Sequence, residues 1–258
     1  MRAAPVLTAL ATLAAGAAPR PALAQTLLDQ EQRLIEIHSL LLDLPPLQSP
    51  AALGSGTLGV SLEVVGIPPI DGTTGSKTQR TASDHTRLFP RPRLQVGLPA
   101  PEGFRAFAGI SWIPPVEFRD VTTNALGGEA GFGGVAGALR GGVRVHAVAA
   151  VGKAPVTDPA TRDELRTLVW GGEAAFGAHV AWGALALEPY AGAGIVALRG
   201  RFHVTSDGNE IDSDYTGAAL HAGIRLLYRA RWEGVAECDA YPGRLVHVNV
   251  RLGYLFGG

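Results

Sequence analysis

The chain has 258 residues, of which 34 are glycine and only 17% are charged. Average proteins contain about 7% glycine and about 25% charged residues. Glycine without a collagen period, mixed with valine, alanine, leucine and aromatic residues, favours curved β-sheet. The formal net charge of −1 gives no electrostatic basis for binding nucleic acid. The single cysteine, Cys238, excludes an internal disulfide.

The N-terminus has the pattern of a secretory signal peptide. Arg2 precedes an apolar stretch over residues 6–18, and Ala22-Leu23-Ala24 is a small-x-small cleavage site before Gln25. The apolar stretch is shorter than the ~20 residues that a spanning helix needs. We therefore expect a signal peptide at 1–24, an amphipathic helix and Pro-rich linker at 25–50, and a β-barrel at 51–258.

Residues 26–43 carry the one good helical pattern, which Pro45-Pro46 ends. Its apolar stripe consists of Leu27, Leu34, Ile37, Leu41 and Leu44. Two placements fit a barrel protein: a short periplasmic helix against the barrel base or a partner, and a plug inside the lumen. Because an apolar stripe suits a polar lumen poorly, the periplasmic placement is favoured.

Ten segments after Pro50 alternate apolar and polar residues with period 2, as strands with two different faces do. In residues 244–256 every second residue from Val246 to Phe256 is apolar, and His247, Asn249 and Arg251 lie between them. Long connections alternate with tight turns, which predicts an antiparallel barrel with two unlike rims. An even strand count also places both chain ends at the short-turn, periplasmic rim. The expected strands are 56–66, 87–98, 103–112, 124–134, 141–152, 166–179, 183–202, 215–229, 232–239 and 244–256.

Alternation does not say which face points inward, because a soluble lipocalin-like barrel or β-sandwich would bury the apolar face. Three observations favour a membrane barrel. The segments are about as long as the ~9–11 residues of a membrane strand, glycine crowds the polar face, and aromatic residues cluster near strand ends as girdles do. These aromatic residues are Trp112, Trp170, Trp182, Trp232, Tyr228, Tyr254 and Phe256.

Prolines interrupt the pattern in three places. Pro90 and Pro92 remove backbone donors from the second strand, which either projects beyond the bilayer or begins only at Arg93. Residues 67–75 and 113–116 carry proline pairs at strand exits and are expected to form stiff loops at the long-loop rim.

The final strand resembles the closing strand of bacterial outer-membrane β-barrels, in which an aromatic residue ends the chain as an assembly signal. Tyr254 and Phe256 match that signal, although Gly257 and Gly258 follow them here. The resemblance implies a Gram-negative outer membrane, contact with its lipid and lipopolysaccharide, and folding by a barrel-assembly machinery. It implies no single activity. No cofactor is expected, and any periplasmic or extracellular protein partner stays open.

The polar face of the strands, which we expect to point inward, carries both arginines and glutamates. They predict either ion pairs that fill the lumen or a narrow channel with a slight anion preference, since seven arginines face five glutamates (7 − 5 = +2). Ten strands lie nearer to the filled limit of eight than to the open limit of sixteen. The predicted lumen set is Arg91, Arg93, Arg105, Arg144, Arg225, Arg229, Arg251, Glu63, Glu129, Glu173, Glu188 and Glu237.

Histidines and rim acids offer weaker chemistry. His146, His179, His221 and His247 share the inward face without the short spacing of a metal site, so no metal is expected. Ten strands with acids and imidazoles at the rim resemble omptin proteases in architecture alone. A rim hydrolase is thus a third alternative, beside solvated loop charge and cation-bridged contact with lipopolysaccharide. Its candidates are Asp84, His85, Asp207, Asp212 and Asp214. The presence of acids and histidines does not by itself make a general base, which needs a defined geometry, so no enzyme is expected.

Overall fold

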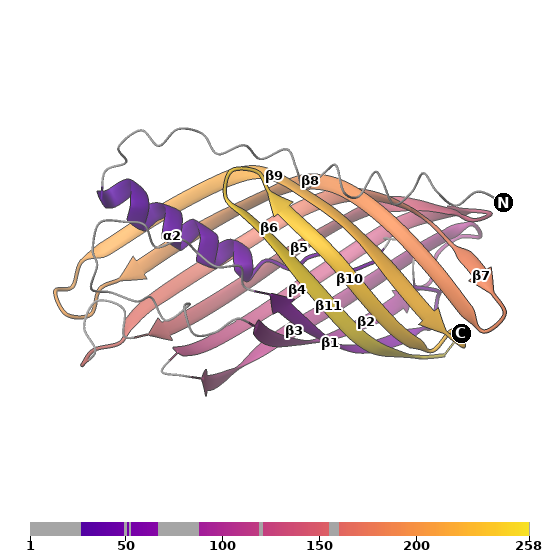
Figure 1. The fold of residues 1–258 in the computed structure, drawn as a ribbon, viewed down its shortest axis with the longest axis horizontal. Coiled ribbons are helices and arrows are strands. Elements are labelled where there is room, and N and C mark those ends of the chain that lie inside the picture. The colour runs from indigo at the N-terminus through magenta and orange to yellow at the C-terminus, as the bar shows by residue number, and fades with distance from the viewer. Residues whose placement is uncertain are drawn as a thin grey trace.

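The computed structural model describes residues 27–48, 51, 53–66, 88–118, 121–154 and 160–257. The predicted signal peptide lies outside these residues. The described chain forms one helix followed by antiparallel strands (Figure 1). The elements are α2 (Leu27–Leu41), β1 (Leu58–Gly66), β2 (Leu88–Leu98), β3 (Phe104–Phe118), β4 (Val121–Ala136), β5 (Leu139–Ala154), β6 (Asp163–Ala178), β7 (Val180–Trp182), β8 (Leu185–His203), β9 (Glu210–Tyr228), β10 (Trp232–Tyr241) and β11 (Leu245–Phe256).

The strands close into a barrel. Each strand pairs with its sequence neighbour, β1 pairs with β11, and β6 pairs with β8. The short β7 continues the line of β6 beyond His179 and pairs with the same strand, β8. Counting β6 and β7 as one, the described wall has ten antiparallel strands, as predicted. A closed wall leaves no free strand edge.

Apolar side chains cover the outside of the barrel and polar side chains point inward. On β11, Leu252 is 67% exposed whereas Arg251 is 0% exposed. On β5, Val145 is 60% exposed whereas Arg144 is 2% exposed. Soluble monomers do not expose an apolar surface of this extent, whereas a barrel in lipid requires one. The architecture is that of a membrane-spanning β-barrel, which agrees with the resemblance of the last strand.

The two rims differ in the length of their connections. The short-turn rim carries the turns at 98–104, 136–139, 182–185 and 228–232. The opposite, long-loop rim carries the turn at 203–210 and the ends of β1, β2, β5 and β6, whose connections are longer in sequence. Strands at the long-loop rim run further than expected. The predicted loop at 113–123 is instead the paired end of β3 and β4, with a register shift between Ile113 and Val116. Pro114 and Pro115 lack backbone donors, so the ladder skips them and resumes beyond.

Pro90 and Pro92 lie within β2, so of the two alternatives the one in which this strand begins only at Arg93 is wrong. Both prolines keep their register with β1, opposite Val64 and Leu62. The ladder between β2 and β3 begins only at Arg93. Because proline cannot donate a hydrogen bond, the wall tolerates the two residues where β2 has no ladder with β3.

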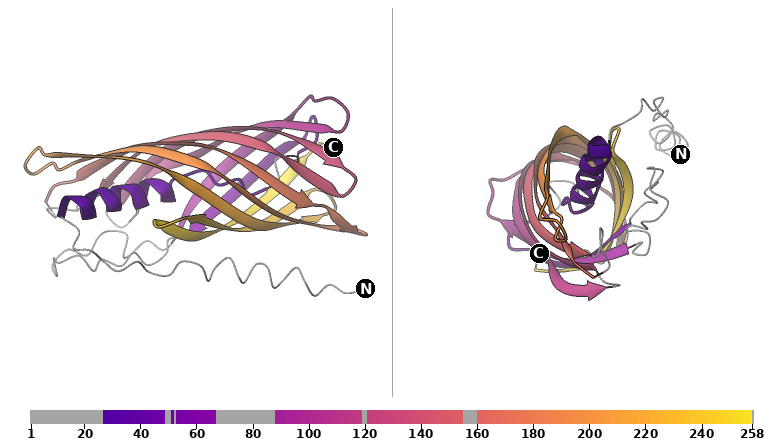
Figure 2. Two further views of the ribbon diagram at one scale, coloured as in Figure 1. Left: turned by 90° about the horizontal axis from the view of Figure 1, so that it is seen from above. Right: turned by 90° about the vertical axis from the view of Figure 1, so that its left-hand side faces the viewer.

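Helix α2 forms within the predicted range but lies inside the lumen, so its favoured periplasmic placement was wrong. The end-on view in Figure 2 shows the indigo helix within the ring of strands. Ile37, Leu40 and Leu41 pack against Val169 and Leu198 of the wall. The lumen is apolar near the long-loop rim, which removes the reason for excluding an apolar helix. No helix in the described part of the chain is long and apolar enough to cross a membrane.

The N-terminal segment runs through the lumen from one rim to the other. Gln32 of α2 donates to the Asp212 carbonyl at the start of β9, at the long-loop rim. Ala51 accepts a hydrogen bond from Arg140 near the turn at 136–139, at the short-turn rim. The described chain therefore begins at the long-loop rim and ends, at β11, on the short-turn rim. Both ends of the ten-strand wall, Leu58 of β1 and Phe256 of β11, lie opposite each other at the short-turn rim, as the even strand count predicted. The segment that precedes β1 adds one more crossing, through the lumen.

Candidate functional site

Residues 42–48, here called the strap, follow α2 and occupy the middle of the lumen. Three wall arginines donate to the backbone carbonyls of this strap. Arg91 reaches Leu42 (3.1 Å) and Asp43 (2.6 Å), and Arg144 reaches Leu44 (2.6 Å). Arg93 donates to the Pro45 carbonyl at 3.0 Å. Pro45 and Pro46 have no N–H groups, so this stretch needs donors from the wall, and a guanidinium group offers five.

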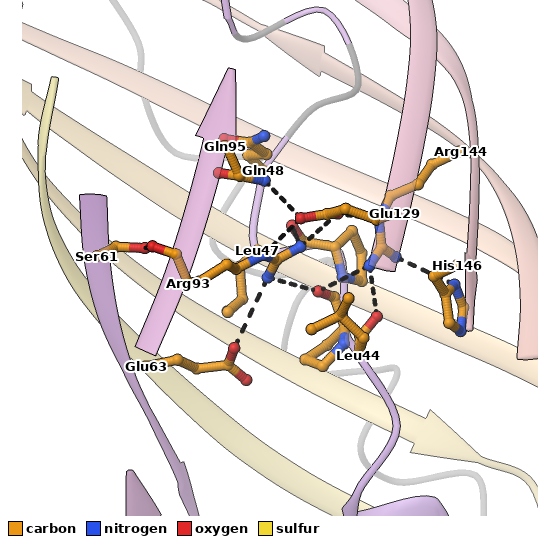
Figure 3. A network of polar contacts seen from close by, with 12 residues as sticks. Leu44, Leu47, Gln48, Ser61, Glu63, Arg93, Gln95, Glu129, Arg144 and His146 are labelled. Carbon is orange, nitrogen blue, oxygen red and sulfur yellow. Dashed lines mark hydrogen bonds and ion pairs between the residues drawn. The ribbon is translucent and has the colours of Figure 1, made fainter. Parts of the chain in front are cut away.

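The same arginines are neutralised by wall glutamates. Arg91 pairs with Glu63 at 2.5 Å, and Arg93 pairs with Glu129 at 2.5 Å. Arg144 pairs with Glu129 at 2.6 Å and also with Glu173. Figure 3 shows Arg93 and Arg144 converging on Glu129. Because all of these groups are buried, each charge depends on its partners, and the network holds the strap and wall as one unit.

Polar side chains also fasten the two ends of the strap. Asp43 bonds His146 Nε2 at 2.8 Å and accepts from the Tyr241 hydroxyl at 2.8 Å. At the other end, the Leu47 amide donates to Glu237 at 3.0 Å, and Arg251 donates to Gln48 at 3.1 Å. The strap is therefore bonded to β2, β5, β10 and β11, around most of the wall.

A second ion-pair cluster and an apolar seal lie nearer the short-turn rim. Arg225 pairs with Glu188 at 2.6 Å and with Glu233 at 2.5 Å, and Arg251 pairs with Glu233 at 2.9 Å. Beyond them, the buried Leu53 packs in one cluster with side chains from four wall strands. These are Phe107, Ala186, Leu227 and Leu255. Glycine makes room for Phe107, since a Cβ on Gly131 of the next strand would overlap its ring.

Helix α2 is held at the other end mainly by apolar contact. Its buried side chains join one cluster with residues of β6, β8, β10 and β11. Polar ties are few: Glu36 pairs with Arg244 at 2.5 Å and accepts from Ser213 at 3.2 Å. The cluster consists of Ile37, Leu40, Leu41, Val169, Val196, Leu198, Tyr241 and Leu245. The lumen is thus occupied at both ends and in the middle by the chain's own residues.

Most of the predicted lumen residues are brought together by the barrel. Ten of the twelve are buried, all except Arg105 and Arg229. Arg105 is half-buried near the short-turn rim. Arg229 does not face the lumen, and its assignment was wrong: it is exposed at the turn after β9, has φ of 52° and lies over the Tyr228 ring. The alternation was extended one residue past the end of the strand.

Several lumen residues were missed. Glu233 and Asp239 have the same parity as Glu237 on β10, and that parity would have identified both. No sequence pattern identifies Asp43, Gln48 and the strap carbonyls as lumen groups. They contact the wall only because the chain passes through the lumen. Gln95 was also missed and is buried. Asn249, which the alternation placed on the polar face, is buried as predicted.

The lumen charge differs from the expectation of a positive lining. Among the buried wall residues that the structure describes, five arginines face eight acids, so the formal sum is 5 − 8 = −3. The predicted basis for an anion preference is therefore wrong. The acids are Glu63, Glu129, Asp163, Glu173, Glu188, Glu233, Glu237 and Asp239.

The rim candidates for catalysis do not form a site among the described residues. Asp84 and His85 lie outside them. Asp207 accepts hydrogen bonds from Asn209 within its own turn. Asp212 and Asp214 lie on the exposed outer face of β9 and pair with Arg201 and Arg199. The described residues contain no group of three or more metal-ligating side chains that could hold an ion.

The predicted assembly residues lie on the outer face, at the end of β11. Phe256 is exposed, and its ring lies 4.7 Å from that of Tyr254, edge to face. The Tyr254 ring also contacts Trp232 at 4.9 Å. Aromatic rings at a strand end match the girdle of a membrane barrel. Their role in assembly stays a prediction.

The sequence matches no known family model and no curated protein. Among solved structures, the N-terminal β-barrel domain of Pseudomonas aeruginosa OprF is similar, with 12% identity over 79% of this chain and 100% of that one, at a TM-score of 0.34. The attachment invasion locus protein Ail of Yersinia pestis has 12% identity over 78% of this chain and 99% of that one, at a TM-score of 0.31. The translocator domain of the autotransporter NalP from Neisseria meningitidis has 13% identity over 89% of this chain and 95% of that one, at a TM-score of 0.39. All three are bacterial outer-membrane β-barrels.

Proposed function

We propose that this chain is a sealed, non-conducting outer-membrane barrel that acts structurally, or by binding, through its outer surface and long loops. The observation that carries the proposal is the set of bonds from Arg91, Arg93 and Arg144 to the backbone of the strap. A solute crossing the barrel would have to displace the strap from these buried donors. Each donor left without a partner would then carry the cost of an unsatisfied buried group.

The lumen charges support sealing rather than conduction. A selective pore uses wall groups to replace the hydration shell of an ion, and these groups must be free to do so. Here the arginines are bonded to glutamates and strap carbonyls at 2.5–3.1 Å. Ten strands also enclose a narrow bore, which side chains and one chain segment can fill.

A hydrolase at the rim has less support. The acids of β9 pair with arginines on the outer face, and no base lies beside them in an enclosed site in the described part of the chain. General acid–base catalysis requires a base within hydrogen-bond reach of the reacting proton in a defined pocket. A non-enzymatic role therefore fits these residues better.

Single-channel recording tests the proposal. The refolded wild-type protein in a planar bilayer should give no discrete conductance steps. Deletion of residues 27–53, which removes α2, the strap and the Leu53 seal, should open a pore. This pore should prefer cations, because the buried wall has a formal sum of −3 by the count given above. Heat-modifiable migration on a gel confirms that each variant has folded as a barrel.

A milder variant provides a second route. Arg91→Gln with Glu63→Gln leaves the net charge unchanged and weakens the bonds to the carbonyls of Leu42 and Asp43. It should give intermittent conductance in a folded barrel. The matched control is Arg199→Gln with Asp214→Asn, which removes an exposed pair on the outer face and should stay silent. Regular conductance of the wild-type protein would refute the sealed barrel.

A further inference from the structure

Two buried carboxyl groups of β10, those of Glu237 and Asp239, lie beside the end of the strap. They occupy successive inward positions of one strand and are 1% and 3% exposed. A hydrogen bond links the two side chains. An ionised carboxylate has no proton to donate, so a hydrogen bond between two carboxyl groups requires that one of them is protonated. We call these two residues the acid pair.

The acid pair differs from the other buried glutamates of the wall in its partners. Each of those glutamates pairs with at least one buried arginine, and they are Glu63, Glu129, Glu173, Glu188 and Glu233. In the described part of the chain, Glu237 and Asp239 form no ion pair, and their donors are neutral. The Leu47 amide donates to Glu237 at 3.0 Å, and the Asn249 amide donates to Asp239 at 2.5 Å. Two carboxyl groups therefore lie in the interior without a counter-charge.

Two histidines and one tyrosine border the acid pair on the neighbouring strands. His221 of β9 and His247 of β11 lie directly opposite Asp239. His247 is 3% exposed, and neither of its ring nitrogens has a hydrogen-bond partner among the described residues. His221 Nε2 has none there either. The hydroxyl group of Tyr190, on β8, faces Glu237. These rings border the pair but form no ion pair with it.

Three charged groups face this part of the lumen from other elements, and each is bonded to partners of its own. They are Asp43 with His146 and Tyr241, Glu63 with Arg91, and Arg144 with Glu129 and Glu173. On β11, Arg251 pairs with Glu233. Like charges repel strongly where water does not screen them, so two adjacent buried carboxyl groups do not both ionise at a small cost.

We propose that Glu237 and Asp239 hold one proton between them at neutral pH and that this proton keeps the Leu47 end of the strap closed. With the proton present, the pair carries one negative charge, which the amides of Leu47 and Asn249 stabilise. The Leu47 side chain also packs in a small apolar cluster with residues of β8 and β10. When hydroxide takes the proton at alkaline pH, the two carboxylates repel each other and the Leu47 end opens. This inference does not depend on the sealed lumen, because the pair can share a proton whether or not the barrel conducts.

Infrared spectroscopy of the refolded full-length protein in lipid vesicles tests the shared proton. A protonated carboxyl group has a carbonyl stretching band apart from the bands of carboxylates and amides. The wild-type protein should show this band at neutral pH and lose it as the pH rises. Glu237→Gln combined with Asp239→Asn should lack the band, because the amides keep the shape of the acids without a titratable group. A wild-type protein without the band, as expected if a metal cation neutralised the pair, would overturn the proposal, and so would a band that persists in the double variant.

The pH dependence of stability provides a second test. At neutral pH the exposed carboxyl groups of the unfolded chain bind no proton, whereas the folded acid pair binds one. Unfolding then releases a proton, so the free energy of unfolding falls as the pH rises. The urea midpoint of the wild-type protein in vesicles should fall between about pH 7 and about pH 10. The double variant should show a much smaller fall, and equal falls in the two proteins would overturn the proposal.

Glu233→Gln is the matched control, since it removes an inward acid of the same strand that pairs with Arg225 and Arg251. It should keep the infrared band and the pH-dependent fall of the wild-type protein. Amide hydrogen exchange, corrected for its intrinsic pH dependence, locates the opening. Protection of residues 44–48 should fall at alkaline pH in the wild-type protein and in this control, but not in the double variant. A loss spread equally over the strap and the strands would contradict a role at the strap end.

Discussion

Helix α2 and the strap lie next to each other in one lumen but are held in different ways. The strap is bonded to the wall by buried arginines and by Glu237, through its own backbone. The helix satisfies its backbone internally and rests on Val169, Leu198 and their neighbours through apolar contact. In a network of buried charges, removal of one partner destabilises the others as well. Each apolar contact instead contributes a small and largely separate amount to the stability.

This difference implies unequal stability along the plug. A segment held by apolar contacts near an open rim can leave its site without disturbing the wall, and such local openings require less than the global free energy of unfolding. If the strap leaves, buried arginine donors and the Glu237 carboxyl group lose their backbone partners. We therefore expect α2 to open more often than the strap.

The largest effect is expected from Arg144→Ala in the strap network. The change removes one of the partners of Glu129 and of Glu173, and it removes the donor to the Leu44 carbonyl. Breaking a buried pair by removing one partner costs about 3–5 kcal/mol. Denaturant unfolding of the protein in lipid vesicles measures this loss. Arg199→Ala, at an exposed pair, is the control and should show no measurable loss; equal losses would contradict a dry network.

The helix is tested by Leu40→Ala. Leu40 is fully buried in the apolar cluster, and truncation of such a leucine costs about 2–5 kcal/mol. If α2 opens on its own, the loss appears as faster amide hydrogen exchange in residues 27–41, with little change in residues 42–48. Exchange that accelerates equally in α2, the strap and the strands would show that the plug and barrel unfold as one unit.

The connection between α2 and the strap is tested by Asp43→Ala. This change leaves His146 Nε2 and the Tyr241 hydroxyl without the partner that each now has at 2.8 Å. An unsatisfied buried polar group costs about 1–3 kcal/mol. Unfolding in vesicles should show the loss, and Asp43→Asn, which keeps an acceptor oxygen, should recover part of it. No recovery would mean that the carboxylate charge matters more than the hydrogen bonds.

The smallest effect is expected from Gln32→Ala. Its amide donates to the Asp212 carbonyl at 3.1 Å in an exposed position. A typical hydrogen bond contributes about 0.5–1.5 kcal/mol, and exposure to water places this one at the lower end. Hydrogen exchange in the first turns of α2 is the suitable measurement. A loss as large as that of Leu40→Ala would show that polar ties, rather than apolar contact, hold the helix.

The strands could be predicted closely because period-2 alternation is a property of the extended backbone itself. The last strand was expected at 244–256 and is observed as Leu245–Phe256. The same alternation placed Arg144, Arg225 and Arg251 on the inner face, where they are buried. It failed at Arg229, one residue beyond β9, where the backbone turns and parity no longer has meaning.

The bonds within the lumen could not be predicted in the same way. Glu129 of β4 joins Arg93 of β2 to Arg144 of β5, and the stagger between these strands decides that meeting. Alternation assigns a residue to a face but not to a height along the barrel. The partners of each charge therefore depend on the register of the closed wall.

The amino-acid sequence by itself determined a secreted-type N-terminal pattern, ten amphipathic strands and an apolar helix ended by Pro45-Pro46, because each is a local pattern of residues. Only the tertiary structure decided that the helix and strap lie inside the barrel. That placement requires Val169, Leu198 and Tyr241, from three strands, to form an apolar surface at one end of the lumen. It also requires Arg91, Arg93 and Arg144 to converge on one extended backbone. Both conditions exist only after the wall has closed.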